Sequence, residues 1–287
     1  MSTRIDAPVA ARWRDRRRQM WGGKLLVHLT LLLVIAFFGA PFLWLLATAL
    51  DHSTESNLFW PRDPTFANFR ALFDDYNVGP ALRTSLIVSL STMAVGTVTA
   101  SLAGYGLSRM TYRRTSWVAY AILLLQTIPL PVTLVAIYDL AFRLRLQDTY
   151  RGLILTHTAI SLPFLVWLMK GHCDAIPRDV EEAAWLDGAS PLRAWIGVVV
   201  PQTLAGLAVA AGFAFAYAWA EVLMAVIVLS GYGMRTLQLE FFDLAKAGAE
   251  TQVTAALGVL YILPVLLVFL ALRRLMIRGL VEGTQGL

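Results

Sequence analysis

The sequence is poor in cysteine and in charged residues, and both shortages limit what the protein can be. Cys173 is the single cysteine among 287 residues, which excludes an intrachain disulfide framework and a cysteine-rich metal site. The four histidines lack a metal-ligand spacing such as HExxH. Only 15% of the residues are charged, against about 25% in an average soluble domain. A metal centre and an ordinary soluble fold are therefore not expected.

Motifs of catalysis are missing as well. The one Gly-Lys pair, Gly23-Lys24, precedes a leucine, so the GxxxxGK[ST] loop that cradles nucleotide phosphates does not occur. Neither paired carboxylates nor GxSxG lies in or beside an apolar segment. We therefore predict that the chain is not an enzyme and has no catalytic residue, no metal and no cofactor of its own.

Apolar residues dominate instead, at 57% of the chain and a mean hydropathy of +0.62. A helix needs roughly 20 consecutive apolar residues to cross a bilayer core, and such runs recur along most of the length. We predict an all-α, polytopic membrane protein with six transmembrane helices. Their approximate bounds are Leu25–Leu50, Leu82–Tyr105, Trp117–Leu140, Gly152–Lys170, Leu204–Leu229 and Val253–Leu272.

Two of these spans contain helix-disrupting residues. Pro129 and Pro131 are expected to kink the third span. The fourth span is interrupted by polar residues and by Pro163, and backbone groups freed at that depth need partners. The fourth span is therefore expected to face protein or solute rather than lipid.

The basic residues indicate the orientation of the chain. Most of the 24 lysines and arginines fall in four segments, namely 1–24, 109–114, 170–201 and 273–287. The positive-inside rule places these segments in the cytoplasm, so both termini are expected there, at the cytoplasmic membrane of a bacterium or archaeon. Arg143, Arg145 and Arg151 then lie outside and fit the rule least well. This distribution explains the net charge of +5 without nucleic acid as a partner.

The predicted organisation has three parts. Residues 1–24 form a basic cytoplasmic segment, residues 25–272 the transmembrane domain, and residues 273–287 a cytoplasmic tail. A signal peptide is the alternative for the first apolar run, because basic residues precede it and Ala47-Thr48-Ala49 is similar to a cleavage site. At about 26 residues the run is longer than the roughly 7–15 of a signal peptide, so we favour a retained helix.

The cytoplasmic loop 171–201 has the signals of two short helices. Pro177 suits the first position of a helix, and acidic residues follow where the helix macrodipole favours negative charge. Gly188 is placed to end this helix in a left-handed conformation. Ser190 can cap a second helix that has Pro191 at its first position. The loop is therefore expected to be a rigid, bent unit.

Two functions fit such a unit. Ala183 and Ala184 keep its surface small enough for another protein to approach closely, and Glu182 offers a charge to a basic partner. Alternatively, the unit is an amphipathic hairpin that rests on lipid headgroups. Composition alone leaves both open.

The spacing in this loop resembles a family motif, the EAA signature of ABC importer permeases. That signature reads EAA, three residues, G, nine residues and I-x-L-P. The chain matches it in type and spacing, with valine in place of isoleucine and leucine, at Glu182, Ala183, Ala184, Gly188, Val198, Val200 and Pro201. The resemblance favours docking over resting on lipid.

The resemblance covers most of the chain and points to the sugar-importing, maltose-type branch. Similar stretches lie at 41–44, 66–69, 104–109, 146–153, 162–164 and 176–190. The chain departs from the family at Trp219-Ala220-Glu221, where the family has W-N-E, and in its short glycine-rich tail. The resemblance implies a permease subunit for a sugar, oligosaccharide or polyol. Its implied partners are a second, related permease, two ATPase subunits that carry ATP and Mg, an external solute-binding protein and membrane lipid.

On this resemblance the loop 171–201 couples ATPase closure to the spans. It is expected to move as a rigid body and to switch the spans between outward and inward access. The residues expected to carry this coupling are Glu181, Glu182, Ala183, Ala184, Asp187, Gly188 and Pro201.

Residues within the spans suggest a solute pathway or gate. Glu221 is the only acidic residue well inside a predicted span, where a charge is costly and indicates either function or a structural pair. Aromatic faces and amides suit hydroxyl-rich solutes, although each also fits helix packing, as does His157. The candidates are Gln126, Tyr138, Trp167, Tyr217, Trp219 and Glu221.

An ion-coupled secondary transporter is the alternative function. It would need intramembrane carboxylates or broken-helix ion sites, and usually repeated halves. The sequence has no visible internal repeat, and Glu221 alone is weak support. The ATP-driven importer is therefore the favoured hypothesis.

Overall fold

The computed structural model describes residues 7–53, 60–110, 115–229, 231 and 233–284. Within these residues the chain is almost entirely helical, and its only β pairing is an isolated bridge between Asp51 and Pro64. The all-α prediction is confirmed. The helices are α1 (Ala7–Ala49), α2 (Ala67–Asp74), α3 (Val78–Arg109), α4 (Thr115–Leu124), the 3-10 turn η1 (Leu125–Thr127), α5 (Leu130–Arg143), α6 (Tyr150–Asp174), α7 (Arg178–Leu186), α8 (Pro191–Ala194), the π-helical turn η2 (Trp195–Val199), α9 (Val200–Gln202), α10 (Leu204–Ala220), α11 (Leu223–Val228), α12 (Leu237–Ala247) and α13 (Thr251–Thr284).

Four of these helices are long and apolar enough to cross a membrane by themselves. They are the part of α1 from Leu26, α3, α6 and α13 as far as Ile277. Two further crossings are available as bent pairs, one from Trp117 to Arg143 and one from Pro191 to Ala220. The described chain therefore offers six crossings if each bent pair counts as one, in agreement with the six predicted spans.

The third and fifth predicted spans are not the continuous helices that the sequence suggested. In the third, the chain turns by 95° between η1 and α5, because Pro129 offers no N–H and its ring keeps the preceding residue extended. The expected kink is present, but it breaks the span. In the fifth, α10 ends at Ala220, and Glu221 has extended backbone with ψ of 123°. The predicted end at Leu229 was therefore wrong.

The crossing helices approach one another through small residues. α3 lies against α6 and α10, and α10 lies against α13. At Gly104 of α3 the backbone of α6 is so close that a Cβ would lie 2.7 Å from the Lys170 nitrogen. A Cβ at Gly206 of α10 would lie 2.4 Å from the His172 ring. Small residues let membrane helices pack closely, and this contact brings the end of α3 next to the end of α6.

The fourth predicted span, α6, is the most enclosed of the four long helices. In its most apolar window 44% of the residues are buried, against 33% in α3 and 17% in α13. Leu165 and Met169 pack against Ala210 and Ala214 of α10 in one buried cluster. Part of this span therefore packs against protein, and the expectation that the rest faces solute rather than lipid stays a prediction.

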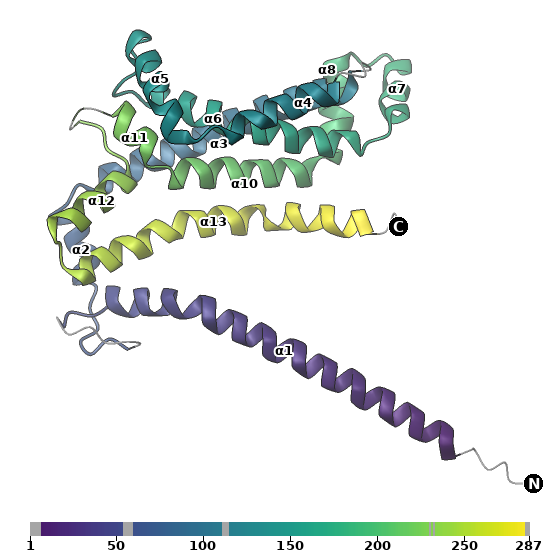
Figure 1. Cartoon of the computed structure of the whole chain (residues 1–287), viewed down its shortest axis with the longest axis horizontal. Coiled ribbons are helices and arrows are strands. Elements are labelled where there is room, and N and C mark those ends of the chain that lie inside the picture. The colour runs from purple at the N-terminus through teal and green to yellow at the C-terminus, as the bar shows by residue number, and fades with distance from the viewer. Residues whose placement is uncertain (1–6, 54–59, 111–114, 230, 232, 285–287) are drawn as a thin grey trace, which may run out of the picture.

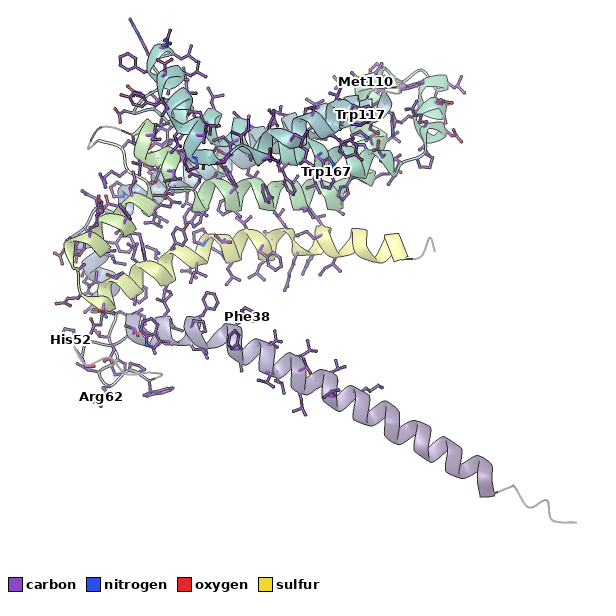
Figure 2. All side chains as sticks on the ribbon, in the orientation of Figure 1. Phe38, His52, Arg62, Met110, Trp117 and Trp167 are labelled. Atoms are coloured by element: carbon purple, nitrogen blue, oxygen red, sulfur yellow. The ribbon has the colours of Figure 1, made fainter. Side chains whose placement is uncertain are left out.

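Helix α1 stands apart from the others. No residue in its most apolar window is buried, and Figure 1 shows it diverging from α13 toward its N-terminal end. Its last turns pack on α13, where Leu45 meets Gly258. Phe38, labelled on this helix in Figure 2, is exposed. An apolar surface of this extent is typical of contact with lipid or with another membrane protein.

The two ends of the molecule are built from different elements. α7 and α8 lie at one end with the start of α1 and the end of α13, whereas α2, α5 and α12 lie at the other (Figure 1). At the α2 end, the side-chain amide of Asn68 donates two hydrogen bonds. One goes to the carbonyl of Ala49, the last residue of α1, at 2.9 Å, and the other to the carbonyl of Asp51 at 2.8 Å. Burial alone would raise the pKa of the Asp51 carboxyl, but hydrogen bonds from Ser53, Asp63 and Arg62 hold it below its usual range. Hydrogen bonds among Asp51, Ser53, Asp63 and Asn68 thus hold the α2 end together.

Candidate functional site

The loop 171–201 folds into the bent unit that the sequence predicts. α7 begins directly after Pro177, one residue later than expected, and α8 has Pro191 at its first position. The Ser190 hydroxyl accepts a hydrogen bond from the backbone N–H of Arg193 at 3.4 Å, as an N-cap residue does. η2 and α9 then return the chain to α10.

The turn between α7 and α8 depends on Gly188. Its φ is +86°, the left-handed conformation expected from the sequence. Its N–H donates to the Trp185 carbonyl, and the N–H of Ala189 donates to the Ala184 carbonyl, both at 3.0 Å. These paired bonds form a Schellman motif, which satisfies carbonyls left free at a helix end. A Cβ at Gly188 would meet no atom within 4 Å, so the requirement for glycine here is conformational.

Helix α7 has two different faces. On the outer face Leu186 is 89% exposed, and Glu182, Ala183 and Asp187 are exposed with it. On the inner face the side chain of Glu181 is only 1% exposed. Ala184 is half-buried, and Pro201 is exposed within α9. Of the predicted coupling residues, Glu181 alone therefore points into the protein.

Glu181 binds to the end of α3. Arg109, the last residue of α3, donates from Nε to Glu181 Oε1 at 2.7 Å, and its Nη2 contacts the same oxygen. The Tyr105 hydroxyl donates to Glu181 Oε2 at 2.8 Å. The guanidinium also donates to the carbonyls of Cys173 at 3.1 Å and Ile176 at 3.3 Å. One arginine thus bonds to the end of α6, to the α6–α7 connection and to α7.

Sequence reasoning identified Glu181 but missed Arg109 and Tyr105. The sequence analysis places Arg109 in a basic segment, 109–114, on the cytoplasmic side. Its neighbours in sequence, Met110 and Trp117, lie at the α7–α8 end of the molecule in Figure 2. The stretch 104–109, which resembles a family motif, was the one signal that this helix end is special.

A second cluster surrounds Glu221, in the break between α10 and α11. Its carboxylate accepts hydrogen bonds from the N–H groups of Leu223 at 2.9 Å and Met224 at 2.7 Å, and so caps α11. Glu221 Oε2 also lies 3.5 Å from Nε2 of the buried His157 of α6. The Tyr217 ring lies edge-on to the His157 ring, with 6.3 Å between centroids. The structure therefore brings two pathway candidates, Glu221 and Tyr217, together with His157.

The other four pathway candidates do not join this cluster. Trp219 is fully buried, and its indole N–H donates to the Tyr261 carbonyl at 3.0 Å, which makes it a packing residue in this conformation. Gln126 lies in the broken third span and donates to the Ile160 carbonyl at 2.7 Å. Tyr138 is exposed on α5.

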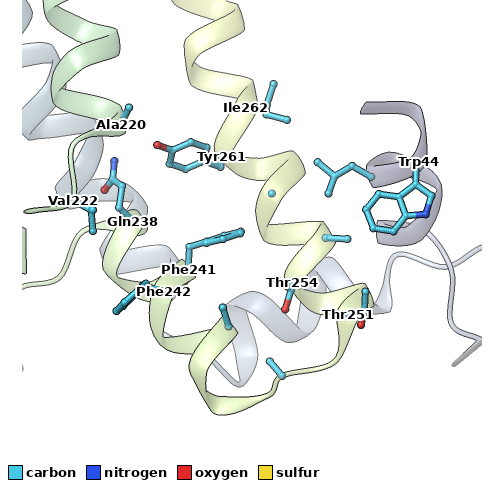
Figure 3. Close-up of a pocket in the computed structure, with 15 residues that line it drawn as sticks. Trp44, Ala220, Val222, Gln238, Phe241, Phe242, Thr251, Thr254, Tyr261 and Ile262 are labelled. Atoms are coloured by element: carbon cyan, nitrogen blue, oxygen red, sulfur yellow. The ribbon is translucent and has the colours of Figure 1, made fainter. Parts of the chain in front are cut away.

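Trp167 instead lines a cavity of about 930 Å³ near the α7 end, together with Lys170, His172 and Gln202. A second cavity, of about 750 Å³, lies between the end of α1, α12 and α13 (Figure 3). Trp44, Phe241, Phe242 and Tyr261 give it an aromatic lining. Among the residues that the structure describes, no group of three or more histidine, cysteine, aspartate or glutamate side chains could hold a metal ion.

Comparison with protein families matches residues 95–281 to the binding-protein-dependent transport system inner membrane component. This range contains both clusters and the whole α7–α8 unit. It begins within α3 and ends within α13, and it leaves out α1, α2 and the hydrogen-bonded residues at the α2 end.

Two relatives match over nearly the whole chain. The sulfoquinovosyl glycerol transport system permease protein of Agrobacterium fabrum is 31% identical over 260 residues, which cover 88% of this chain and 90% of that protein. The diacetylchitobiose uptake system permease protein of Streptomyces coelicolor is 27% identical, over 87% of this chain and 93% of that one. Among solved structures, a bacterial ABC transporter involved in import of the acidic polysaccharide alginate has a chain with the same fold. The TM-score is 0.74 at 17% identity, covering 91% of this chain and 97% of that one.

Proposed function

The chain belongs to the family of binding-protein-dependent transport system inner membrane components, and on that premise we propose that α7 carries ATP-driven movement into the membrane helices of a sugar importer. The membership makes it a permease subunit of an ABC importer. The observation that carries the proposal is the exposed outer face of α7, in which Leu186 is 89% exposed at the tip of a rigid unit. An apolar side chain held at such a position suits docking into a groove on another protein.

The coupling role of the loop rests on its local rigidity. Glu182, Ala183 and Asp187 form an exposed surface with small and acidic side chains, and the turn at Gly188 holds it at a fixed angle to α8. Closure of a pair of ATPase subunits would move this surface as one body. ATP and Mg are assigned to those subunits, so this chain contributes movement and no hydrolysis.

The solute is proposed to be a sugar, an oligosaccharide or a polyol. The two relatives are named for glycosidic solutes, sulfoquinovosyl glycerol and diacetylchitobiose. We assign a second, related permease and an external solute-binding protein as partners, with both termini in the cytoplasm. In support, the start of α1 and the end of α13 lie at the same end of the molecule as α7 (Figure 1). Family membership favours this importer over the ion-coupled transporter, which the comparisons do not support.

A photocrosslinker tests the docking surface. Placed at Leu186 in native membranes, it is expected to capture an ATP-hydrolysing subunit, because this side chain projects from α7. The matched control is Val135 on α5, which is 76% exposed but lies at the other end of the molecule. Failure at Leu186, or equal capture at both positions, would refute the assignment.

A glycine pair tests the bend. Gly188→Val forces a branched side chain into a left-handed conformation at a cost of about 1–2 kcal/mol, and we expect normal membrane insertion but less copurifying ATPase. Gly197→Val in η2 is the control, since Gly197 also has open space around it but no positive φ. Equal ATPase yields from the two variants would remove Gly188 from the mechanism.

The sugar assignment is tested separately, by thermal shift of the copurifying binding protein with monosaccharides, disaccharides, polyols and, as controls, amino acids.

A further inference from the structure

Arg109 gathers three segments of the chain at one side chain. It ends α3, and its guanidinium bonds to Glu181 on α7 and to the carbonyls of Cys173 and Ile176 at the end of α6 and just beyond it. The last carbonyls of a helix have no partner within that helix; the Cys173 carbonyl accepts the Ile176 N–H at 3.2 Å, and the arginine adds a second donor to it and one to the Ile176 carbonyl. The Tyr105 hydroxyl, one turn earlier on α3, binds the second oxygen of Glu181.

The remaining contacts of α7 show why this cluster matters. Beyond it, α7 packs mainly on η2 and α8, which belong to the same loop. Arg178 adds one hydrogen bond, from its Nη2 to the Ser108 carbonyl at 3.3 Å. The chain itself joins α7 to the end of α6, so a displacement of α7 reaches α3 chiefly through the Arg109–Glu181 pair and the Tyr105 hydroxyl.

The Arg109–Glu181 pair also holds α7 firmly against α3. The side chains of Arg109 and Glu181 are 14% and 1% exposed, so water competes little for their hydrogen bonds. A guanidinium presents several donors in a rigid plane, which a lysine ammonium cannot do. The α3–α6 contact at Gly104 holds the two helix ends in place around it.

We propose that Arg109 is a positioning residue that transmits the movement of α7 to α3, and this inference rests on the coupling function proposed for α7. With the link intact, α7, the end of α3 and the end of α6 move as one unit when ATP binds to the partner subunits. With the link weakened, ATP still moves α7, but α7 slides relative to α3, and hydrolysis continues without the matching movement of α3.

The test is a distance measurement in the complete complex, copurified with its ATPase and held in lipid nanodiscs. Spin labels at Val180→Cys on α7 and Leu102→Cys on α3, both exposed positions, report the link. The probe is ATP with vanadate, compared with the nucleotide-free state. The native Cys173 is fully buried and does not compete for label. In the otherwise unchanged chain the distance distribution is expected to be the same in both states.

Three variants sharpen the measurement. Arg109→Lys keeps the charge but loses the fork, and a second distance population is expected to appear with ATP and vanadate while ATP hydrolysis persists. Exchanging the charges, with Arg109→Glu and Glu181→Arg together, restores an α3–α7 pair and is expected to restore the single distance. Arg178→Gln removes a neighbouring arginine that makes one hydrogen bond here, and it is the control expected to behave as the unchanged chain.

The outcomes separate this inference from the proposed function. If an active ATPase copurifies and Arg109→Lys keeps the single distance in both states, Arg109 only stabilises the fold and the inference is overturned. If no ATPase copurifies with the unchanged chain, the function proposed for α7 fails first.

Discussion

The Arg109–Glu181 cluster and the His157–Glu221 cluster are both buried, but their atoms are bonded to very different extents. In the first, both carboxylate oxygens have donors, and the guanidinium reaches a carboxylate, a hydroxyl and two carbonyls. In the second, Glu221 is bonded by two backbone N–H groups. Yet neither ring nitrogen of His157 has a hydrogen-bond partner among the described residues, and the same holds for the Tyr217 hydroxyl.

This difference indicates different uses of buried polarity. A fully bonded cluster is rigid, because moving any member leaves a buried charge or donor without a partner. In a partly bonded cluster, fewer hydrogen bonds must break when a side chain moves. Rigidity is useful where α7 is joined to α3 and α6. Looseness is useful at a break between helices, such as the one that separates α10 from α11.

The largest expected effect is the loss of one partner from the rigid cluster. Arg109→Met leaves the Glu181 carboxylate buried without a counter-charge, which costs about 3–5 kcal/mol in comparable buried pairs. The midpoint of thermal unfolding of the complex in detergent is therefore expected to fall sharply. Adding Glu181→Leu removes the stranded charge, so the double variant should regain much of the loss. A double variant no more stable than Arg109→Met would show that the carboxylate is not confined as the structure places it.

The next effect tests the close contact that supports the rigid cluster. Gly104→Ala puts a Cβ 2.7 Å from the Lys170 nitrogen, and overpacking of this kind costs about 1–3 kcal/mol. Gly106→Ala is the matched control two residues away, because its Cβ would meet nothing within 4 Å. Replacing glycine by alanine within a helix is otherwise favourable by about 0.5–1 kcal/mol. Thermal unfolding should thus move in opposite directions for the two variants, and movement in the same direction would contradict the contact.

Sequence analysis predicted the α7–α8 unit well because its signals are local. Gly188, Ser190 and Pro191 each act within a few residues, so the turn and the second helix follow from spacing alone. The Arg109–Glu181 pair joins residues 72 positions apart, and no local pattern marks such a contact. Six apolar spans could also be predicted, because the hydropathy of a segment depends only on which residues it contains.

The breaks in the spans were harder to foresee. Pro129 predicted a kink but not a turn of 95°, which depends on how η1 packs against α6 and α5 against α11. At Glu221 neither proline nor glycine marks the end of α10, and the apolar run continues for eight residues. There the Glu221 carboxylate caps the next helix, α11, by accepting the N–H groups of Leu223 and Met224. Hydropathy gives no sign of such a hydrogen bond.

A smaller effect is expected from removing this cap. Glu221→Ala removes the acceptor of the Leu223 and Met224 N–H groups, and loss of a helix cap of this kind costs about 0.5–2 kcal/mol. The loss should be local, with faster hydrogen exchange at the Leu223 and Met224 amides and little change in α7. Glu182→Ala is the control, an exposed glutamate for which a change within about 0.5 kcal/mol is expected. Unchanged exchange at both amides would mean that α11 does not depend on Glu221.

The smallest effect is expected at His157, and it decides whether the second cluster is as loose as the structure indicates. His157→Phe keeps the edge-on contact with Tyr217 but removes two ring nitrogens that have no hydrogen-bond partner among the described residues. Replacing an unbonded polar ring by an apolar one of similar shape is close to neutral or stabilising. Tyr217→Phe follows the same logic, because it removes a hydroxyl that has no hydrogen-bond partner among the described residues and keeps the ring contact with His157. A loss of thermal stability as large as that of Arg109→Met would show that His157 is firmly bonded to Glu221. In that case both clusters would be rigid, and the break after α10 would need another source of mobility.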